Sequence, residues 1–407
     1  MKKVVIVLIG VIVLIGGFFL FKNDNSEKFD SDSKVNKPID SVYRDEIAEK
    51  VENKLKSMTL DEKIAQMIVL AWRDPNTYDE LYRTFRDYKP SGFILFKENM
   101  STYEKTKTLI SNLKEYNDIP LIVSMDQEGG LVQRLKYLKD VKVTDIPCMY
   151  YLGKTNDESL AYDVGRVMAE ELRTIGINVV YAPDIDIYSN PNNIVIGKRS
   201  FGSDYLLVNK MATSLAKGLE ETGVIPTYKH FPGHGDTATD SHKDLPIINK
   251  TYNELKKLEL QTFQNAIQND AKIIMVGHIA LPNITGDNTP ASLSKELITD
   301  VLKKDMGYNG LVITDALNMK ALTDNYSSKD IVVKAIDAGV DILLMPEDIE
   351  NTIKYIKENI SEERINESVE KILTFKYKYL NNYELLGKEY LGSKEHKDII
   401  SKIPIND

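Results

Sequence analysis

The feature that most limits the fold of this chain is a regular alternation of short apolar runs with longer amphipathic segments. Most of the short runs are continuous apolar blocks, as strands buried on both faces of a parallel sheet require. They span residues 65–72, 91–96, 121–125, 177–183, 224–231, 272–279, 311–314 and 341–345. Helical patterns lie between them, at 102–117, 157–175, 204–222 and 252–269, and one more follows at 361–380. Since eight βα units close a barrel, we expect an α/β fold, the TIM-type (β/α)8 barrel.

An open doubly wound sheet has a similar pattern of strands and helices. The first strand is not followed by a Gly-rich GxGxxG turn, which disfavours that alternative. The 407 residues, 42% of them hydrophobic, supply enough apolar surface for one large core. We expect a single catalytic domain at 41–386 and a C-terminal tail at 387–407.

The amino terminus predicts a membrane anchor. Lys2 and Lys3 precede an uncharged apolar stretch, Val4–Phe21, whose 18 residues would span about 27 Å as a helix, close to the hydrocarbon thickness of a bilayer. No small-x-small cleavage site suits this stretch, which favours a signal-anchor at 1–21 over a removed signal peptide. The amino-terminal lysines place the rest of the chain outside the cytoplasm. We expect an extracytoplasmic domain held at the cell membrane, or secreted if the segment is cleaved, on a flexible polar linker at 22–40.

Charge and cysteine content exclude several functions. The net charge is −9 and no Lys/Arg-rich run occurs, so nucleic acid is not an expected partner. The single cysteine, Cys148, excludes a disulfide within the chain and any CxxC metal or redox site. We interpret it as a small buried apolar residue. The sequence contains no signal for the oligomeric state.

Titratable residues gather at the predicted carboxyl ends of the strands. In a parallel barrel these ends share one face, where the active site is built. A solvated rim accounts for one or two such residues but not for six. They are Asp126, Asp184, Asp186, His230, His278 and Asp315.

The densest motif runs from Lys229 to His242 and reads KHFPGHGDTATDSH. Its histidines and aspartates suit either a zinc or manganese site or proton transfer. In the second reading Asp240 orients His242, whose imidazole acts as general acid and base. For His234, between two glycines, a purely structural role in the loop is also open.

Three further motifs are weaker when taken singly. Asp315 ends the seventh strand, where its carboxylate could attack an anomeric carbon or simply cap a helix. Asp126 begins DQEGG and is followed by Arg134, an arrangement that suits close approach to a polar ligand. The segment GKRSFG at 197–202 pairs two cations with flexible glycines and is typical of hydroxyl or anion recognition, and equally of plain surface.

Together these motifs resemble family 3 glycoside hydrolases, in particular the β-N-acetylhexosaminidase branch. KHFPGHGDTATDSH, SMDQEGGLVQR, GKRSFG and ITDALNM match in order, over about residues 60–380. The resemblance implies a retaining β-N-acetylglucosaminidase that releases terminal, β-linked N-acetylglucosamine through a covalent aspartyl intermediate and without a metal cofactor. Leu131 stands where the family commonly has arginine, so we expect the residues behind the sugar-contacting side chains of that loop to differ from the family pattern, while Arg134 is retained.

The resemblance also implies a role for each matched residue. Asp315 would be the nucleophile and His242 the acid/base, assisted by Asp240. The sugar would be held by Asp126, Arg134, Arg199, Lys229 and His230. For a tethered, outward-facing enzyme we expect peptidoglycan fragments or related wall glycans as substrate. The alternatives are a β-glucosidase or β-xylosidase of the same superfamily, a phosphorolytic variant, a metallohydrolase, and a non-catalytic protein that binds wall glycan.

Overall fold

The computed structural model describes residues 39–237, 241, 244–381 and 383–405. Contacts divide the chain into two units, 1–43 and 44–407, and the description below concerns the second. The predicted membrane segment Val4–Phe21 and nearly all of the predicted linker lie outside the described residues. Within the described part, every helix is too short or too polar to cross a bilayer.

Eight parallel strands form one sheet in the order β10-β1-β2-β3-β6-β7-β8-β9. The two ends of the sheet meet, because Ile313 bridges Ile342 and Thr314 N donates to Ile342 O at 3.1 Å. The strands are β1 Ile68–Ala71, β2 Gly92–Leu95, β3 Ile122–Met125, β6 Val179–Val180, β7 Ile225–Phe231, β8 Ile273–Val276, β9 Leu311–Thr314 and β10 Leu343–Leu344. All eight lie within the runs predicted from the sequence, and the TIM-type barrel is confirmed.

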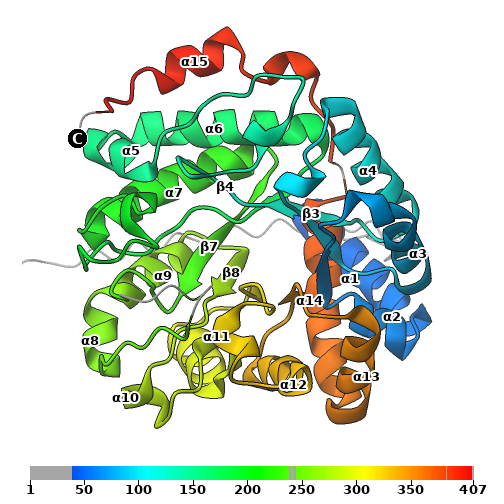
Figure 1. Cartoon of the computed structure of the whole chain (residues 1–407). Helices are drawn as coiled ribbons and strands as arrows, with labels where there is room; N and C mark the ends of the chain where they lie inside the picture. The colour runs from blue at the N-terminus through cyan, green and yellow to red at the C-terminus, as the bar shows by residue number, and fades with distance from the viewer. Residues whose placement is uncertain (1–38, 238–240, 242–243, 382, 406–407) are drawn as a thin grey trace, which may run out of the picture. The chain divides into compact units, whose positions relative to one another are not determined.

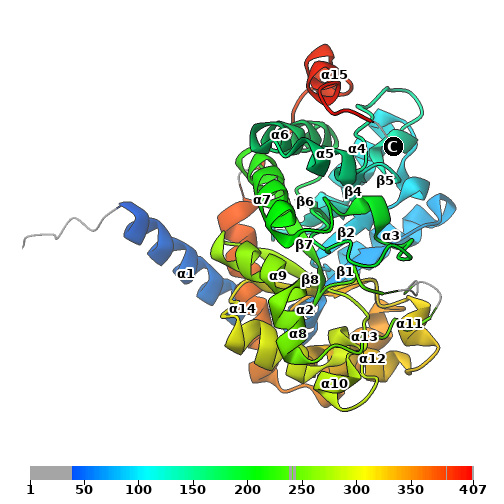
Figure 2. The same ribbon diagram turned by 90° about the vertical axis from the view of Figure 1, so that its left-hand side faces the viewer.

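Helices surround the strands of this unit (Figure 1). The second view shows α6 and α7 side by side, away from α12 and α13 (Figure 2). The longer helices are α1 Ile39–Ser57, α3 Tyr78–Tyr88, α4 Tyr103–Glu115, α6 Glu158–Ile175, α7 Tyr205–Glu221, α9 Glu259–Gln268, α12 Ser328–Ala338, α13 Ile349–Asn359 and α14 Glu362–Tyr379. The shorter ones are α2 Leu60–Ala65, α5 Met149–Thr155, α8 Tyr252–Lys257, α10 Pro282–Thr285, α11 Lys320–Thr323 and α15 Lys394–Ile400, with a π-helix at Glu296–Asp305.

Helix boundaries follow local capping chemistry. Asp157 Oδ1 accepts a hydrogen bond from Leu160 N at 3.1 Å and starts α6, and Gly176, at φ 99°, ends it. One boundary differs from the sequence prediction. The segment 252–269 is two helices, because Leu258 leaves the helical conformation with φ −132° and ψ −77°.

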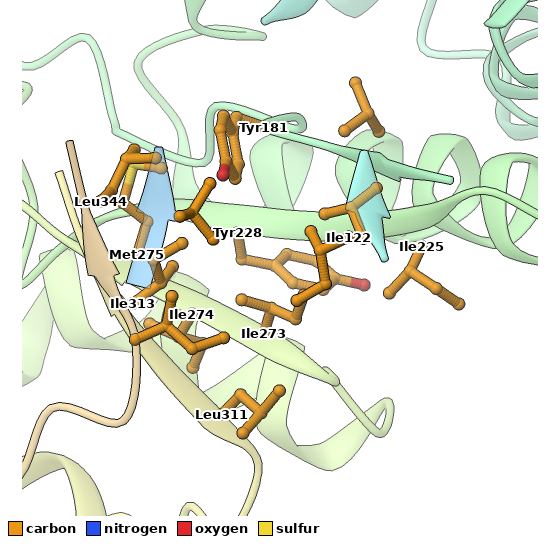
Figure 3. Packing of buried hydrophobic residues seen from close by; sticks show 14 of the residues in the cluster. Ile122, Tyr181, Ile225, Tyr228, Ile273, Ile274, Met275, Leu311, Ile313 and Leu344 are labelled. Carbon is orange, nitrogen blue, oxygen red and sulfur yellow. The ribbon is translucent and has the colours of Figure 1, made fainter. Parts of the chain in front are cut away.

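The interior of the barrel is apolar. Figure 3 shows buried side chains from β3, β7, β8, β9 and β10 gathered together, among them Ile122, Tyr228, Met275, Ile313 and Leu344. Such a filled interior makes the barrel a packed core rather than a pore. Function is therefore confined to the loops at the strand ends.

The C-terminal segment after α14 packs on α6 through α15. His396 is 1% exposed, and its Nε2 lies 2.7 Å from Glu170 Oε2. Glu171 Oε1 accepts from Gly392 N at 2.8 Å and lies 3.3 Å from His396 Nδ1. Burial lowers the pKa of His396, but the bonds to Glu171 and Glu170 outweigh it and leave the pKa raised. The segment is thus attached to the barrel by a buried ion pair.

Candidate active site

A cavity of about 180 Å³ lies at the carboxyl ends of the strands. It is smaller than the ~300–1,000 Å³ of sites for drug-sized ligands, and its size suits a single sugar ring. Of the eight residues to which the resemblance gave a catalytic or sugar-binding role, six line it: Asp126, Arg134, Arg199, Lys229, His230 and Asp315. The other two, Asp240 and His242, lie outside the described residues. Ser241, between them, lines the cavity.

Asp315 directly follows β9, with its N–H donating to Val276 O at 2.9 Å. Burial raises the pKa of this carboxyl, but the neighbouring His278 and His230 and the bond from Ala316 N (2.7 Å) outweigh burial and leave the pKa below its usual value. The carboxyl is therefore an anion at neutral pH. It does not cap a helix, because α11 begins at Lys320. The structure thus removes the helix-cap interpretation of Asp315.

His278 helps to hold this strand end. Its Nε2 lies 3.0 Å from Ala316 O, and its Nδ1 lies 2.7 Å from Ser292 Oγ. A carbonyl only accepts, so Nε2 carries a proton and donates to it. The imidazole fixes the backbone that immediately follows Asp315.

A buried ion-pair network forms one wall of the cavity. Glu128, only 2% exposed, accepts from Arg199 Nε at 2.7 Å and Nη2 at 2.8 Å. Its Oε1 also lies 2.5 Å from Lys229 Nζ, which donates to Asp126 Oδ1 at 2.9 Å. Burial raises the pKa of Glu128, but Arg199 and Lys229 hold it well below its usual range. Burial lowers the pKa of Lys229, and Asp126 and Glu128 raise it above its usual value. Glu128, Arg199 and Lys229 are therefore charged, and each is held by hydrogen bonds or ion pairs to its neighbours.

Sequence reasoning gave Glu128 no role, although it belongs to a motif that was singled out. It lies on β4, Gln127–Gly129, which pairs with β5, Val132–Gln133, in a hairpin. A Cβ at Gly130, where φ is 55°, would lie 2.2 Å from Cys148 Sγ. The second glycine of DQEGG is therefore required for packing against Cys148. The hairpin turns Glu128 toward cations that follow it by 71 and 101 residues, and a local motif does not reveal such partners.

Arg134, after the hairpin, has unused hydrogen-bonding capacity. Its Nη2 lies 3.8 Å from Asp126 Oδ2, and its Nε is buried without a hydrogen-bond partner among the described residues. Leaving a buried donor unpaired costs about 1–3 kcal/mol. A ligand oxygen in the cavity would satisfy this donor.

Asp186 organises a second, neighbouring cluster. Its Oδ2 lies 2.7 Å from His230 Nδ1, and its Oδ1 accepts from His234 N at 2.6 Å. Burial raises the pKa of Asp186 and lowers that of His230 to about 4, so the imidazole is neutral. The bond to the carboxylate places the imidazole proton on Nδ1 and leaves Nε2 of His230 as an acceptor. Asp186 was noted in the sequence at a strand end but was given no function.

His234 is buried in the loop after β7. Its Nδ1 lies 2.6 Å from Thr237 Oγ1 and its Nε2 3.4 Å from Ser241 Oγ. Burial, followed by the influence of His230, lowers the pKa of His234 to about 4. These contacts within the loop agree with the structural interpretation of this residue, although it also borders the cavity.

Asp184, Asp186 and His230 offer ligand atoms within 4.8 Å of one another, a spacing that a metal ion could use. Arg199 Nη2 lies 3.3 Å from Asp184 Oδ2, however, and Asp186 already binds the His230 ring. A cation beside the arginine would be repelled. Burial and the neighbouring Asp186 raise the pKa of Asp184 to about 7, which weakens it as an anionic ligand. These residues fit a self-contained hydrogen-bond network better than they fit a metal site.

Comparison with known proteins identifies the family. The glycosyl hydrolase family 3 N-terminal domain matches residues 59–375. The chain is 30% identical over 358 residues to β-hexosaminidase A of Pseudoalteromonas piscicida, covering 80% of this chain and 60% of the relative's length. The structure of a family 3 β-N-acetylglucosaminidase from Paenibacillus sp. str. FPU-7 superposes with a TM-score of 0.79 at 32% identity, covering 85% of this chain and 68% of that one.

A β-glucoside phosphorylase superposes with a TM-score of 0.80 at 27% identity, covering 88% of this chain and 66% of that one. The barrel, the cavity at its carboxyl face and the family match over residues 59–375 agree with one another. Relatives named as hexosaminidases support β-hexosaminidase activity within the family. The chain belongs to glycosyl hydrolase family 3 and is a glycoside hydrolase.

Proposed function

We propose that this enzyme is a retaining β-N-acetylglucosaminidase with Asp315 as its nucleophile. The observation that carries the proposal is the partly buried, ionised carboxylate of Asp315 in a cavity that suits one sugar ring. A carboxyl group whose pKa lies below its usual value stays deprotonated, and therefore nucleophilic, throughout the neutral pH range. The relatives' names support the amino-sugar substrate.

The first step forms a bond from a carboxylate oxygen of Asp315 to the anomeric carbon and breaks the glycosidic bond. The leaving oxygen takes a proton from an acid, a role that we assign to His242 with Asp240 on the basis of the sequence motif. In the second step a water attacks the anomeric carbon, gives a proton back to the imidazole, and releases Asp315. A neutral imidazole does not repel the incoming water-derived anion as a carboxylate would.

The cavity walls supply partners for the sugar hydroxyls. Lys229 and Arg199 present donors, and Asp126, 20% exposed, presents carboxylate oxygen. Arg134 has its unpaired Nε, and His230 offers Nε2 as an acceptor. Because the charged groups are already held by one another, they need little reorganisation when a ring enters.

The test is hydrolysis of p-nitrophenyl β-N-acetylglucosaminide by the wild type and by Asp315→Ala. We expect release of p-nitrophenol by the wild type only, with an unchanged circular dichroism spectrum in the variant. Near-normal activity of Asp315→Ala would overturn the assignment. A matched p-nitrophenyl glucoside tests the β-glucosidase alternative, which predicts faster release from that substrate.

Phosphorolysis is the second candidate, because one similar structure is titled a β-glucoside phosphorylase. In that reaction phosphate replaces water in the second step. Adding phosphate would then raise turnover and yield N-acetylglucosamine 1-phosphate. Free N-acetylglucosamine as the sole product, with or without phosphate, supports hydrolysis.

We also propose that the substrate is wall glycan outside the cytoplasm. The support is the apolar segment Val4–Phe21 with its preceding lysines. Fractionation of cells, with protease added to intact protoplasts, tests the location. Comparing N-acetylglucosaminyl-N-acetylmuramic acid with chitobiose tests the substrate, and a clear preference for chitobiose would contradict a wall-fragment substrate.

A further inference from the structure

A second cavity, of about 750 Å³, adjoins the candidate active site. Asn318, which follows Asp315 by three residues, lines both cavities. The larger cavity lies where β9 leads to α11 and α12 and where β10 leads to α13, so it opens on the catalytic face of the barrel. No part of the proposed chemistry uses this space.

The lining of this second cavity combines an apolar base with a polar rim. Leu317, Ile331 and Pro346 are buried, while Asn318 and Asn351 are exposed. Two partly buried tyrosines, Tyr326 and Tyr355, add aromatic surface. A few polar groups set in apolar and aromatic surface are the usual composition of a small-molecule site.

The charges of the lining restrict the ligand. Glu347 and Asp348 border the cavity, and none of the described lining residues is Lys, Arg or His. Two helices begin at this cavity, but their first turns are already capped. Ser327 Oγ accepts from Asp330 N at 3.1 Å, and Asp348 Oδ1 accepts from Asn351 N at 3.0 Å. The helix ends therefore offer no anion site, and a carboxylate or phosphate would meet two acids.

We propose that this second cavity binds a neutral sugar unit on the leaving-group side of the glycan, beyond the first leaving-group ring, such as the N-acetylglucosamine that follows N-acetylmuramic acid in a wall glycan. The proposal rests on the proposed glycosidase function. The small cavity suits one ring, so the remainder of a longer chain must leave across its rim, and Asn318 is the rim residue that leads into the larger space. A neutral sugar supplies hydroxyls for the polar rim and an apolar ring face for the tyrosines.

The test compares Tyr355→Ala and Tyr326→Ala with the matched control Tyr252→Ala. Tyr252 is also partly buried and lines neither cavity. The substrates are p-nitrophenyl β-N-acetylglucosaminide, whose leaving group is too short to fill the second cavity, and chitotetraose. We expect kcat/KM for chitotetraose to fall about tenfold in the two cavity variants, through KM. Activity on the p-nitrophenyl substrate should remain unchanged, and the control should match the wild type on both substrates.

The proposal would be overturned if the ratio of kcat/KM for chitotetraose to kcat/KM for the p-nitrophenyl substrate were the same in every variant as in the wild type. The requirement for a neutral ligand would be overturned if kcat/KM for N-acetylglucosaminyl-N-acetylmuramic acid, which bears a carboxylate, fell in the two cavity variants as much as kcat/KM for chitotetraose. Failure of the wild type to cleave the p-nitrophenyl substrate would instead contradict the proposed function. In that event, calorimetric binding of chitotetraose to Asp315→Asn still decides the inference, because loss of Tyr355 should weaken binding about tenfold, and unchanged affinity would refute it.

Discussion

Replacing Glu128 by glutamine removes the anion shared by two cations, the buried Lys229 and the partly buried Arg199. Arg199 forms two hydrogen bonds with this carboxylate, at 2.7 and 2.8 Å, and Lys229 lies 2.5 Å from it. The substitution is nearly isosteric, so the lost charge dominates the effect. Removing one partner of a buried pair costs about 3–5 kcal/mol, because the other charge is left uncompensated. Asp126 and Asp184 still contact the two cations, which keeps the expected loss within that range rather than above it.

The assay is urea denaturation followed by circular dichroism, with the free energy of unfolding extrapolated to water. Glu362→Gln is the matched control. Its carboxylate pairs with Lys63 at 2.9 Å, a similar distance, but is 55% exposed, so its loss should cost about 0–1 kcal/mol. We expect Glu128→Gln also to lower kcat/KM, because Arg199 and Lys229 lose the group that positions them. A loss in Glu128→Gln no larger than in the control would refute the argument that this network is buried and mutually dependent.

Three other substitutions test the site and the C-terminal segment. Asp186→Asn should raise the activation free energy for kcat/KM by about 1.5–3 kcal/mol, the contribution of one charge-assisted hydrogen bond, because the residue no longer fixes the proton on His230 Nδ1. Unchanged values of kcat and KM would contradict this. His242→Ala should lower turnover about 10²–10⁴-fold on natural disaccharides and much less on p-nitrophenyl substrates, and equal losses would show that it is not the acid. His396 has a raised pKa in the folded state, so its ion pair stabilises the protein fully below its unfolded value of about 6.5, and this contribution disappears as pH rises through the higher folded pKa. The difference in unfolding free energy between wild type and His396→Gln should therefore shrink from pH 6 to pH 9, and a constant difference would contradict the ion-pair explanation.

The barrel could be predicted because its strands are continuous apolar blocks, a pattern that parallel packing imposes on the sequence itself. β2, for example, is buried at each of its four positions. The break at Leu258 was missed, because the residues around it keep a helical pattern on both sides. The hairpin of β4 and β5 was missed as well, because strands of two or three residues leave almost no periodic signal.

The site was partly predictable for a related reason. Residues at strand ends, such as Asp126 and Asp315, converge wherever a parallel barrel forms, so position alone identifies them. The roles of Glu128 and Asp186 depend on partners far away in the chain, and only the folded structure brings those partners within hydrogen-bonding distance. The same holds for His396, whose two glutamate partners precede it by more than 220 residues.

The central claim is that Asp315 becomes covalently bound to the sugar. A 5-fluoro derivative of N-acetylglucosaminyl fluoride should slow the second step more than the first and allow the intermediate to accumulate. Mass spectrometry of the intact protein and of its peptides should then show one added sugar, on the peptide that contains Asp315 and at that residue. An adduct on a different residue, or inactivation of the enzyme without any adduct, would contradict the account.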